Sequence, residues 1–205
     1  MERVELINRV RRKIDEVSAA DTPVQSVTIA DENAVDTIID SLLDESAREV
    51  LLKAPVQRLT ISSSTPSAVK NANDTTTGTI QVPKDFLRLV SFRMGDWQRS
   101  VTSLAVKGDA ISMRQSNKYI KGGISKPVGV IAKNSQGIVI EYYSTLQENH
   151  TVAEFLYIKE DVAENIPDTQ MIDALTWICA GKVLSVFGNL PQAQNAYDNA
   201  QSLMI

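Results

Sequence analysis

The fold is decided by residues 168–188, which read DTQMIDALTWICAGKVLSVFG. The apolar residues of this stretch recur at helical spacing, and Asp168 and Gly188 are a favourable N-cap and a favourable C-terminal stop. A helix this apolar has to be covered on most of its sides, so we expect it to be the core helix of the chain. Its apolar residues include Ile172, Leu175, Ile178, Cys179, Val183, Leu184 and Phe187.

Three more segments show helical periodicity, two near the start of the chain and one at its end. The first is broken by Pro23, and the second begins with Asp31 as N-cap and ends before Pro55, because proline cannot continue a helix. The last has Pro191 in its first turn, where proline is tolerated. The expected apolar positions are Val4, Ile7, Val10, Ile14 and Val17 in the first, Val35, Ile38, Ile39, Leu42, Leu43, Ala47, Val50 and Leu51 in the second, and Ala193, Ala196, Tyr197, Ala200 and Leu203 in the last.

Between these helices the pattern changes to that of β-strands. Residues 86–94 are rich in aromatic and branched side chains, and Gly95 offers a turn into a second strand at residues 97–101. A second hairpin is predicted within residues 127–143. A last strand at residues 152–158 is expected in the same antiparallel sheet.

The chain is therefore predicted to be α+β, a helical bundle with an inserted antiparallel β region. Residues 1–58 supply the N-terminal helices, residues 59–160 the inserted β region, and residues 161–205 the helices that complete the bundle. Residues 62–78 are dominated by Ser, Thr, Asn, Asp and Pro, and this composition predicts a long, exposed polar loop. We expect it to contact a neighbouring chain in an assembly, and a flexible insertion with no partner is the alternative.

The composition is that of an ordinary globular chain of 205 residues, 43% hydrophobic and 22% charged. The net charge of −4 argues against a surface that grips nucleic acid throughout, because phosphate binding needs an excess of Lys and Arg. No apolar run suits a signal peptide or a membrane span, and the only cysteine, Cys179, can form no intrachain disulfide. We expect a soluble intracellular protein with no membrane partner.

No motif in the sequence predicts catalysis. The only histidine, His150, lies between two predicted strands, which indicates a surface loop, and Cys179 lies among apolar residues, which indicates an inert core thiol. Neither a metal-ligand spacing nor a glycine-rich phosphate loop is present. We therefore expect no catalytic residue, no metal and no cofactor. An enzyme that uses only carboxylates or lysines stays open as an alternative.

Charge is unevenly distributed along the sequence. Residues 84–133 hold ten Lys and Arg against three Asp, whereas the residues from 141 onward hold nine Asp and Glu against two Lys. Segregated charge of this kind suits head-to-tail association of identical copies or a basic surface near nucleic acid. Solvated faces with no partner are the third interpretation, and the sequence leaves all three open.

Four stretches spread over nearly the whole chain carry a resemblance to a known family. They read AREVLLKAP at residues 47–55, VPKDFLRL at 82–89, WQRSV at 97–101 and DAL at 173–175. Together with the order of the predicted elements, they resemble the head-to-tail adaptor proteins of tailed phages, in particular the podovirus tail-tube A-like adaptors. In such adaptors a similar proline, aromatic, Leu and Arg run enters the β region, and a tryptophan followed by a basic residue comes soon after it.

The resemblance implies a structural subunit of a ring, commonly twelve-fold, between the portal and the tail of a virion. Such a ring is assembled in the host cytoplasm, contacts the portal protein and a tail protein, and surrounds the DNA without reading its sequence. The apolar chain end is then expected to dock into the portal or an adjacent ring, with packing onto its own domain as the alternative. The basic β region is expected to contact a neighbouring subunit or the DNA path, and a nucleic-acid-binding accessory protein remains the alternative function. The expected contact residues are Tyr197, Leu203, Met204 and Ile205 at the chain end, and Arg88, Arg93, Trp97, Arg99, Lys118 and Lys121 in the β region.

Overall fold

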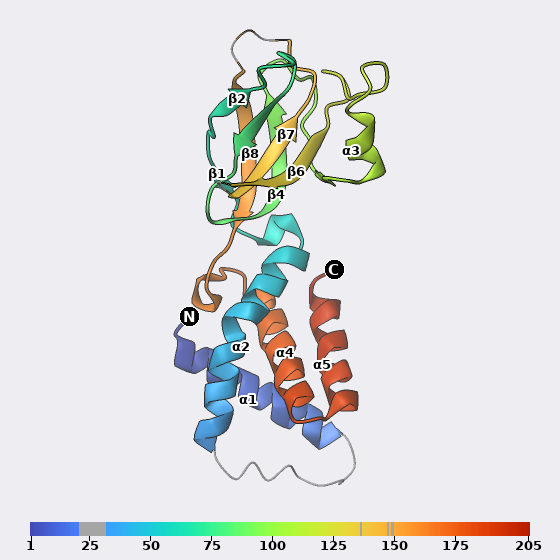
Figure 1. Cartoon of the computed structure of the whole chain (residues 1–205). Coiled ribbons are helices and arrows are strands. Elements are labelled where there is room, and N and C mark those ends of the chain that lie inside the picture. The colour runs from blue at the N-terminus through green and yellow to red at the C-terminus, as the bar shows by residue number, and fades with distance from the viewer. Residues whose placement is uncertain (21–31, 136, 147, 149) are drawn as a thin grey trace. The chain divides into compact units, whose positions relative to one another are not determined.

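The computed structural model describes residues 1–20, 32–135, 137–146, 148 and 150–205. The chain forms two units, a helical unit made of Met1–Thr60 and Glu160–Ile205 and a β unit made of Ile61–Lys159 (Figure 1). The β unit is thus inserted in the sequence between two halves of the helical unit. The α+β fold class predicted from the sequence, with terminal helices and an inner antiparallel region, is confirmed.

The helical unit is built around α4, which packs against α1, α2 and α5 (Figure 1). The carboxylate of Asp168 caps α4 by accepting a hydrogen bond from the Met171 backbone N–H at 3.0 Å, as the sequence predicts. Leu175 in the middle of the helix is fully buried. The apolar stretch at residues 168–188 therefore contains the core helix of this unit. The described helices of this unit are α1 (Arg3–Ala20), α2 (Glu32–Lys53), α4 (Thr169–Val186), α5 (Leu190–Leu203) and the 3₁₀ helices η1 (Val56–Arg58) and η2 (Ala163–Asn165).

The buried stripe of α1 differs from the predicted one. Leu6 is fully buried, whereas Val4 is exposed. The reason is angular, because Val4 lies six residues from the buried Val10, which is about 240° around a helix of 3.6 residues per turn. Phe187, predicted on the apolar face of α4, is also exposed because it follows the last residue of the helix. The N-cap expected at Asp31 lies outside the described residues.

The β unit contains two sheets among its described residues. One has the strand order β1-β8-β4 and the other β2-β3-β7-β6-β5, and every pair is antiparallel except β5 with β6. The hairpin predicted within residues 127–143 is confirmed as β6 and β7. The described elements are β1 (Ser62–Ser63), β2 (Ala68–Lys70), β3 (Gly78–Gln81), β4 (Phe86–Met94), β5 (Ala105–Val106), α3 (Ala110–Arg114), β6 (Gly129–Asn134), β7 (Gly137–Tyr142) and β8 (Val152–Lys159).

Residues 62–78 are not the structureless loop that their composition predicts. Ser62 pairs with Tyr157 of β8, and Ala68 pairs with Ile80 of β3. Both strands lie at the ends of their sheets, where backbone hydrogen bonds form the ladder and polar side chains can stay in solvent. A segment with a polar composition can therefore still form short strands at the edges of sheets.

Two strand-pairing predictions are also corrected. Residues 97–101 form no second strand of a hairpin, because only Val101 makes a bridge, to Phe92. The main partner of β4 is β8. The predicted strand at residues 152–158 exists as β8, but it lies in a different sheet from β6 and β7. The aromatic residues of β4 thus pair with a segment about sixty positions further along the chain, which local turn signals do not report.

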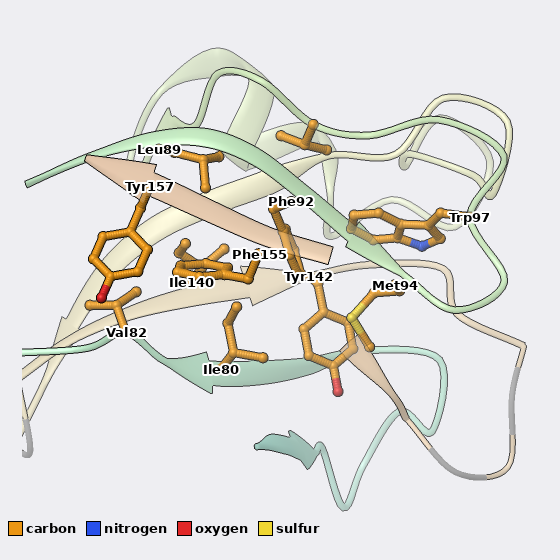
Figure 2. Packing of buried hydrophobic residues seen from close by; sticks show 11 residues of the cluster. Ile80, Val82, Leu89, Phe92, Met94, Trp97, Ile140, Tyr142, Phe155 and Tyr157 are labelled. Carbon is orange, nitrogen blue, oxygen red and sulfur yellow. The ribbon is translucent and has the colours of Figure 1, made fainter. Parts of the chain in front are cut away.

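The two sheets of the β unit share one apolar core. Figure 2 shows Ile80 and Tyr142 from one sheet in the same interior as Phe92 and Phe155 from the other. The ring of Phe92 meets the indole of Trp97 edge to face, with 5.1 Å between their centroids. Edge-to-face pairs of this kind add to the stabilisation that burial provides.

Candidate interaction surfaces

The C-terminal helix packs closely on the core helix because its buried face is made of alanines. Ala193, Ala196 and Ala200 of α5 are all buried. On α4, the position of Gly181 lies under the ring of Tyr197, so close that a Cβ there would be 2.7 Å from a ring carbon. Small residues on both helices therefore let the ring of Tyr197 lie directly against α4, and Tyr197 is half-buried.

A groove of about 610 Å³ lies in the helical unit beside this tyrosine. Its apolar lining includes Ile178, Tyr197, Met204 and Ile205. Its polar lining includes Glu49, which pairs with Lys53 at 2.6 Å. Burial raises the pKa of Glu49, but the hydrogen bond from Lys53 and the charge of Lys182 outweigh it, so the net pKa is lowered and the carboxylate stays charged. We call this feature the C-terminal groove.

The predicted chain-end residues are placed in and beside the C-terminal groove. Leu203 and Met204 are half-buried, and the backbone carbonyl of Leu203 accepts a hydrogen bond from the Gln170 side chain at 2.8 Å. Ile205 is 90% exposed. The chain end is thus held against its own unit up to Met204 and presents one apolar side chain to solvent.

The predicted contact residues of the β unit do not form one surface. Trp97 is only 2% exposed and belongs to the aromatic core, so its assignment as a contact residue is wrong. Arg88 is half-buried in β4, and burial lowers its pKa. Lys121 is engaged within its own unit, with the Thr76 hydroxyl at 2.9 Å and the Asp74 carboxylate at 3.5 Å.

The three remaining predicted residues differ in their exposure. Arg93 is half-buried and lies opposite Glu154 in the β4–β8 register. Arg99 and Lys118 are exposed. The ammonium group of Lys118 lies 5.0 Å from the ring centroid of Tyr119, which is within the range of a cation–π contact. Arg99 and Lys118 are therefore the best-placed of the six to reach a partner.

The structure reveals a further surface that the sequence reasoning missed, around α3 and the turns that follow it. Gln115 is buried there, and its side chain donates to the Ile111 carbonyl at 2.7 Å and accepts from the Gly122 N–H at 2.8 Å. The polar residue thus holds the segment from inside, while large apolar side chains point outward. We call this the α3 surface, and its exposed residues are Val106, Ile111, Met113, Arg114, Lys118, Tyr119 and Ile120.

Individual apolar side chains of the α3 surface are exposed over most of their area. Tyr119 is 83% exposed and Met113 is 67% exposed. Clustered exposed apolar side chains next to charged ones mark contact sites more often than isolated ones do. A signal for them existed in the sequence, because large apolar residues occur here in a short segment without strand or helix periodicity.

In the folded chain, the charge contrast lies between the two units and not between two stretches of sequence. Several C-terminal carboxylates pair inside the helical unit, including Glu160 with Arg48 at 2.9 Å and Asp168 with Arg58 at 3.5 Å. The contrast that remains is between the two units. The β unit has 12 Lys and Arg against 7 Asp and Glu, a net charge of +5, and the helical unit has 9 against 18, a net charge of −9.

His150 and Cys179 have structural surroundings. His150 is half-buried, not in an open loop, and its Nε2 donates to the Thr75 carbonyl at 2.9 Å while its Nδ1 accepts from the Tyr142 hydroxyl at 2.5 Å. Burial raises the pKa of the Cys179 thiol to about 12, and the thiol faces the Ile39 carbonyl at 3.8 Å. Cys179 is therefore a protonated core thiol at neutral pH, as the sequence indicates.

No group of three or more His, Cys, Asp and Glu side chains suited to a metal ion occurs among the described residues. Within the same residues, no helix is long and apolar enough to cross a membrane. A comparison of the sequence with protein-family models gives no match, and a comparison with curated proteins gives none either.

Proposed function

We propose that the chain is a structural subunit of a multi-copy protein assembly. The observation that carries this proposal is the exposure of large apolar side chains on both units, at Ile205 and on the α3 surface. Water-exposed apolar side chains gathered beside charged ones are stabilised when a partner covers them. Units of opposite net charge also favour contact between copies, because complementary potentials steer association.

Within that class, we propose a head-to-tail adaptor of a tailed phage, a ring subunit at the head–tail junction of the virion. The support is the sequence pattern at residues 47–55, 82–89, 97–101 and 173–175, together with a helical unit interrupted by an inserted β unit. The ring lies between the portal protein and a tail protein and surrounds the DNA without reading its sequence. Such a role needs contact surfaces and no reaction centre.

The C-terminal groove is the surface that we assign to the portal or to an adjacent ring. Its apolar lining is partly open, and Ile205 projects beside it. Tyr197 gives the groove a rigid wall, because its ring rests on Gly181. Rigid aromatic side chains are frequent anchors of protein interfaces, since few rotamers are lost on binding.

Substitution at the chain end tests this assignment. Met204→Ser combined with Ile205→Ser should abolish binding to the portal protein of the same genome and leave the melting temperature nearly unchanged. Substitutions are preferable to deleting residues 203–205, because the Leu203 carbonyl is bonded to Gln170. Val69→Ser, at an exposed apolar position of the β unit, is the matched control and should bind normally. Normal portal binding by the double variant contradicts the assignment.

A nucleic-acid-binding accessory protein is the second candidate. It is favoured by the net charge of +5 on the β unit and by the exposed Tyr119 beside Lys118. Retardation of duplex DNA by the purified chain, with a steep loss of affinity as salt rises, would support this function. Weak binding that Lys118→Ala and Arg114→Ala leave unchanged would count against it.

A further inference from the structure

The chemistry of the α3 surface indicates the kind of partner that it fits. Ile111, Met113 and Ile120 are exposed aliphatic side chains, and these gain nothing from contact with a phosphate backbone. Arg114 and Lys118 add positive charge to the same segment. These aliphatic side chains favour a protein surface that is acidic and partly apolar over nucleic acid as the partner.

The helical unit carries a surface of that description. Arg3 is held there among three carboxylates, with Asp40 at 2.5 Å, Glu164 at 3.1 Å and Asp44 at 3.3 Å. The Asp44 carboxylate also accepts from the backbone N–H of Ala163 at 3.1 Å, which ties η2 to α2. These contacts tie α1, α2 and η2 together, and we call the acidic and apolar residues on and beside them the acidic surface. It comprises the exposed Glu2, Val4, Asp44, Glu160 and Val162 and the half-buried Asp40, and Glu160 is paired with Arg48 at 2.9 Å.

We infer that the α3 surface of one copy docks on the acidic surface of the helical unit of a second copy. The inference rests on the proposed assembly function and specifies its subunit contact. Charge complementarity favours a second copy as the partner, since the β unit has a net charge of +5 and the helical unit a net charge of −9. Exposed Val4 and Val162 offer apolar area to the aliphatic side chains of α3. Electrostatic attraction brings the copies together, and apolar contact holds them.

The geometry of such a contact has a consequence for assembly. The two surfaces are different, so each copy keeps one unused surface of each kind after one contact forms. A head-to-tail contact of this kind closes into a ring when the rotation between copies permits, and it does not stop at a dimer. This contact does not involve the C-terminal groove, which stays available for another partner.

The test uses a short bis-maleimide cross-linker on mixed variants that each carry one introduced cysteine. Ser116→Cys places a thiol beside the α3 surface, and Val4→Cys places one on the acidic surface. Native Cys179 is buried and should not react. Mixing the two variants should give a cross-linked dimer that contains one copy of each. Val186→Cys, exposed at the far end of α4, replaces Val4→Cys in the control mixture and should give only background.

Charge reversal makes the test specific. Adding Arg114→Glu and Lys118→Glu to the Ser116→Cys chain should reduce the cross-linked fraction to the level of the control. Adding Glu2→Lys to the Val4→Cys chain should then restore part of it, and Glu160 is left unchanged because it pairs with Arg48 in its own unit. Cross-linking that is equal with Val186→Cys, or that does not respond to the reversals, overturns the inference. DNA retardation that depends on Arg114 and Lys118, without specific cross-linking, also overturns it and assigns the surface to nucleic acid.

Portal binding is measured on the same variants so that the two proposals are separated. Specific cross-linking without portal binding removes the adaptor function and leaves the subunit contact standing. Portal binding without specific cross-linking removes the proposed subunit contact and leaves the adaptor function standing.

Discussion

Gly78 offers a sharp test of the packing in the β unit. It is the first residue of β3 and lies between Lys70 of β2 and Tyr142 of β7 in the sheet. A Cβ at this position would lie 2.2 Å from the Tyr142 hydroxyl oxygen and 2.4 Å from the Val69 carbonyl oxygen. Both distances are far below van der Waals contact, and one neighbour is backbone. Gly78→Ala must therefore displace the tyrosine and disturb the β2–β3 ladder.

The size of the effect follows from three contributions. Overpacking a filled interior costs about 1–3 kcal/mol. Moving the Tyr142 hydroxyl away from His150 loses a hydrogen bond worth about 1 kcal/mol. Replacing glycine lowers the entropy of the unfolded chain and returns about 0.4–1 kcal/mol. We expect Gly78→Ala to reduce the free energy of unfolding of the β unit by about 1–4 kcal/mol.

Urea unfolding followed by the fluorescence of Trp97 measures this quantity in the β unit. The chain has two tryptophans, so the background carries Trp177→Phe, which leaves Trp97 as the only indole. Gly123→Ala is the matched control, because a Cβ there meets nothing within 4 Å. The control should be neutral or slightly stabilising. If Gly78→Ala and Gly123→Ala unfold at the same urea concentration, the close approach of Tyr142 to β3 is refuted.

Three further predictions concern the helical unit and the two residues with reactive side chains. Leu175→Ala in the fully buried middle of α4 should cost about 2–5 kcal/mol in a thermal or urea melt, whereas Ile205→Ala should cost almost nothing, and the opposite order would overturn the core assignment. The free energy of unfolding should fall as pH rises from about 9 to 12, because the pKa of the Cys179 thiol is near 9.0 in the unfolded chain and about 12 in the folded one. Cys179→Ala should shift this loss of stability to higher pH. An unchanged loss of stability in the variant would contradict the burial of the thiol. His150→Gln and Cys179→Ala should both retain portal binding, and loss of binding by a normally folded variant would require a chemical role for that residue.

The helices could be predicted because their signals are local. Asp168 and Gly188 bracket α4 in the sequence, and both act as predicted, with the carboxylate as N-cap and glycine at a φ of +77° after the helix. Pro191 lies in the first turn of α5, as its sequence position predicts. The turn between β6 and β7 ends at Gly137, whose φ of +127° suits glycine. In each case a few neighbouring residues determine the outcome.

The strand partners and the α3 surface could not be predicted in the same way. The pairing of Phe92 with Phe155 joins residues far apart in the sequence, and only the shared core selects it. Trp97 follows a turn and precedes basic residues, so the local pattern does not distinguish a buried indole from an exposed one. The outward orientation of Tyr119 depends on Gln115 bonding inward to Gly122, which is a tertiary contact. Periodicity carries no information about such contacts.

The adaptor function proposed above requires that copies of this chain assemble on a portal ring. Electron microscopy of the portal protein from the same genome, alone and mixed with the chain, tests it most directly, with native mass measurement of the same samples. We expect an added ring coaxial with the portal, with a mass gain equal to a fixed multiple of the 22.5 kDa chain. Portal particles that stay unchanged, with the chain recovered as free monomer, would contradict it.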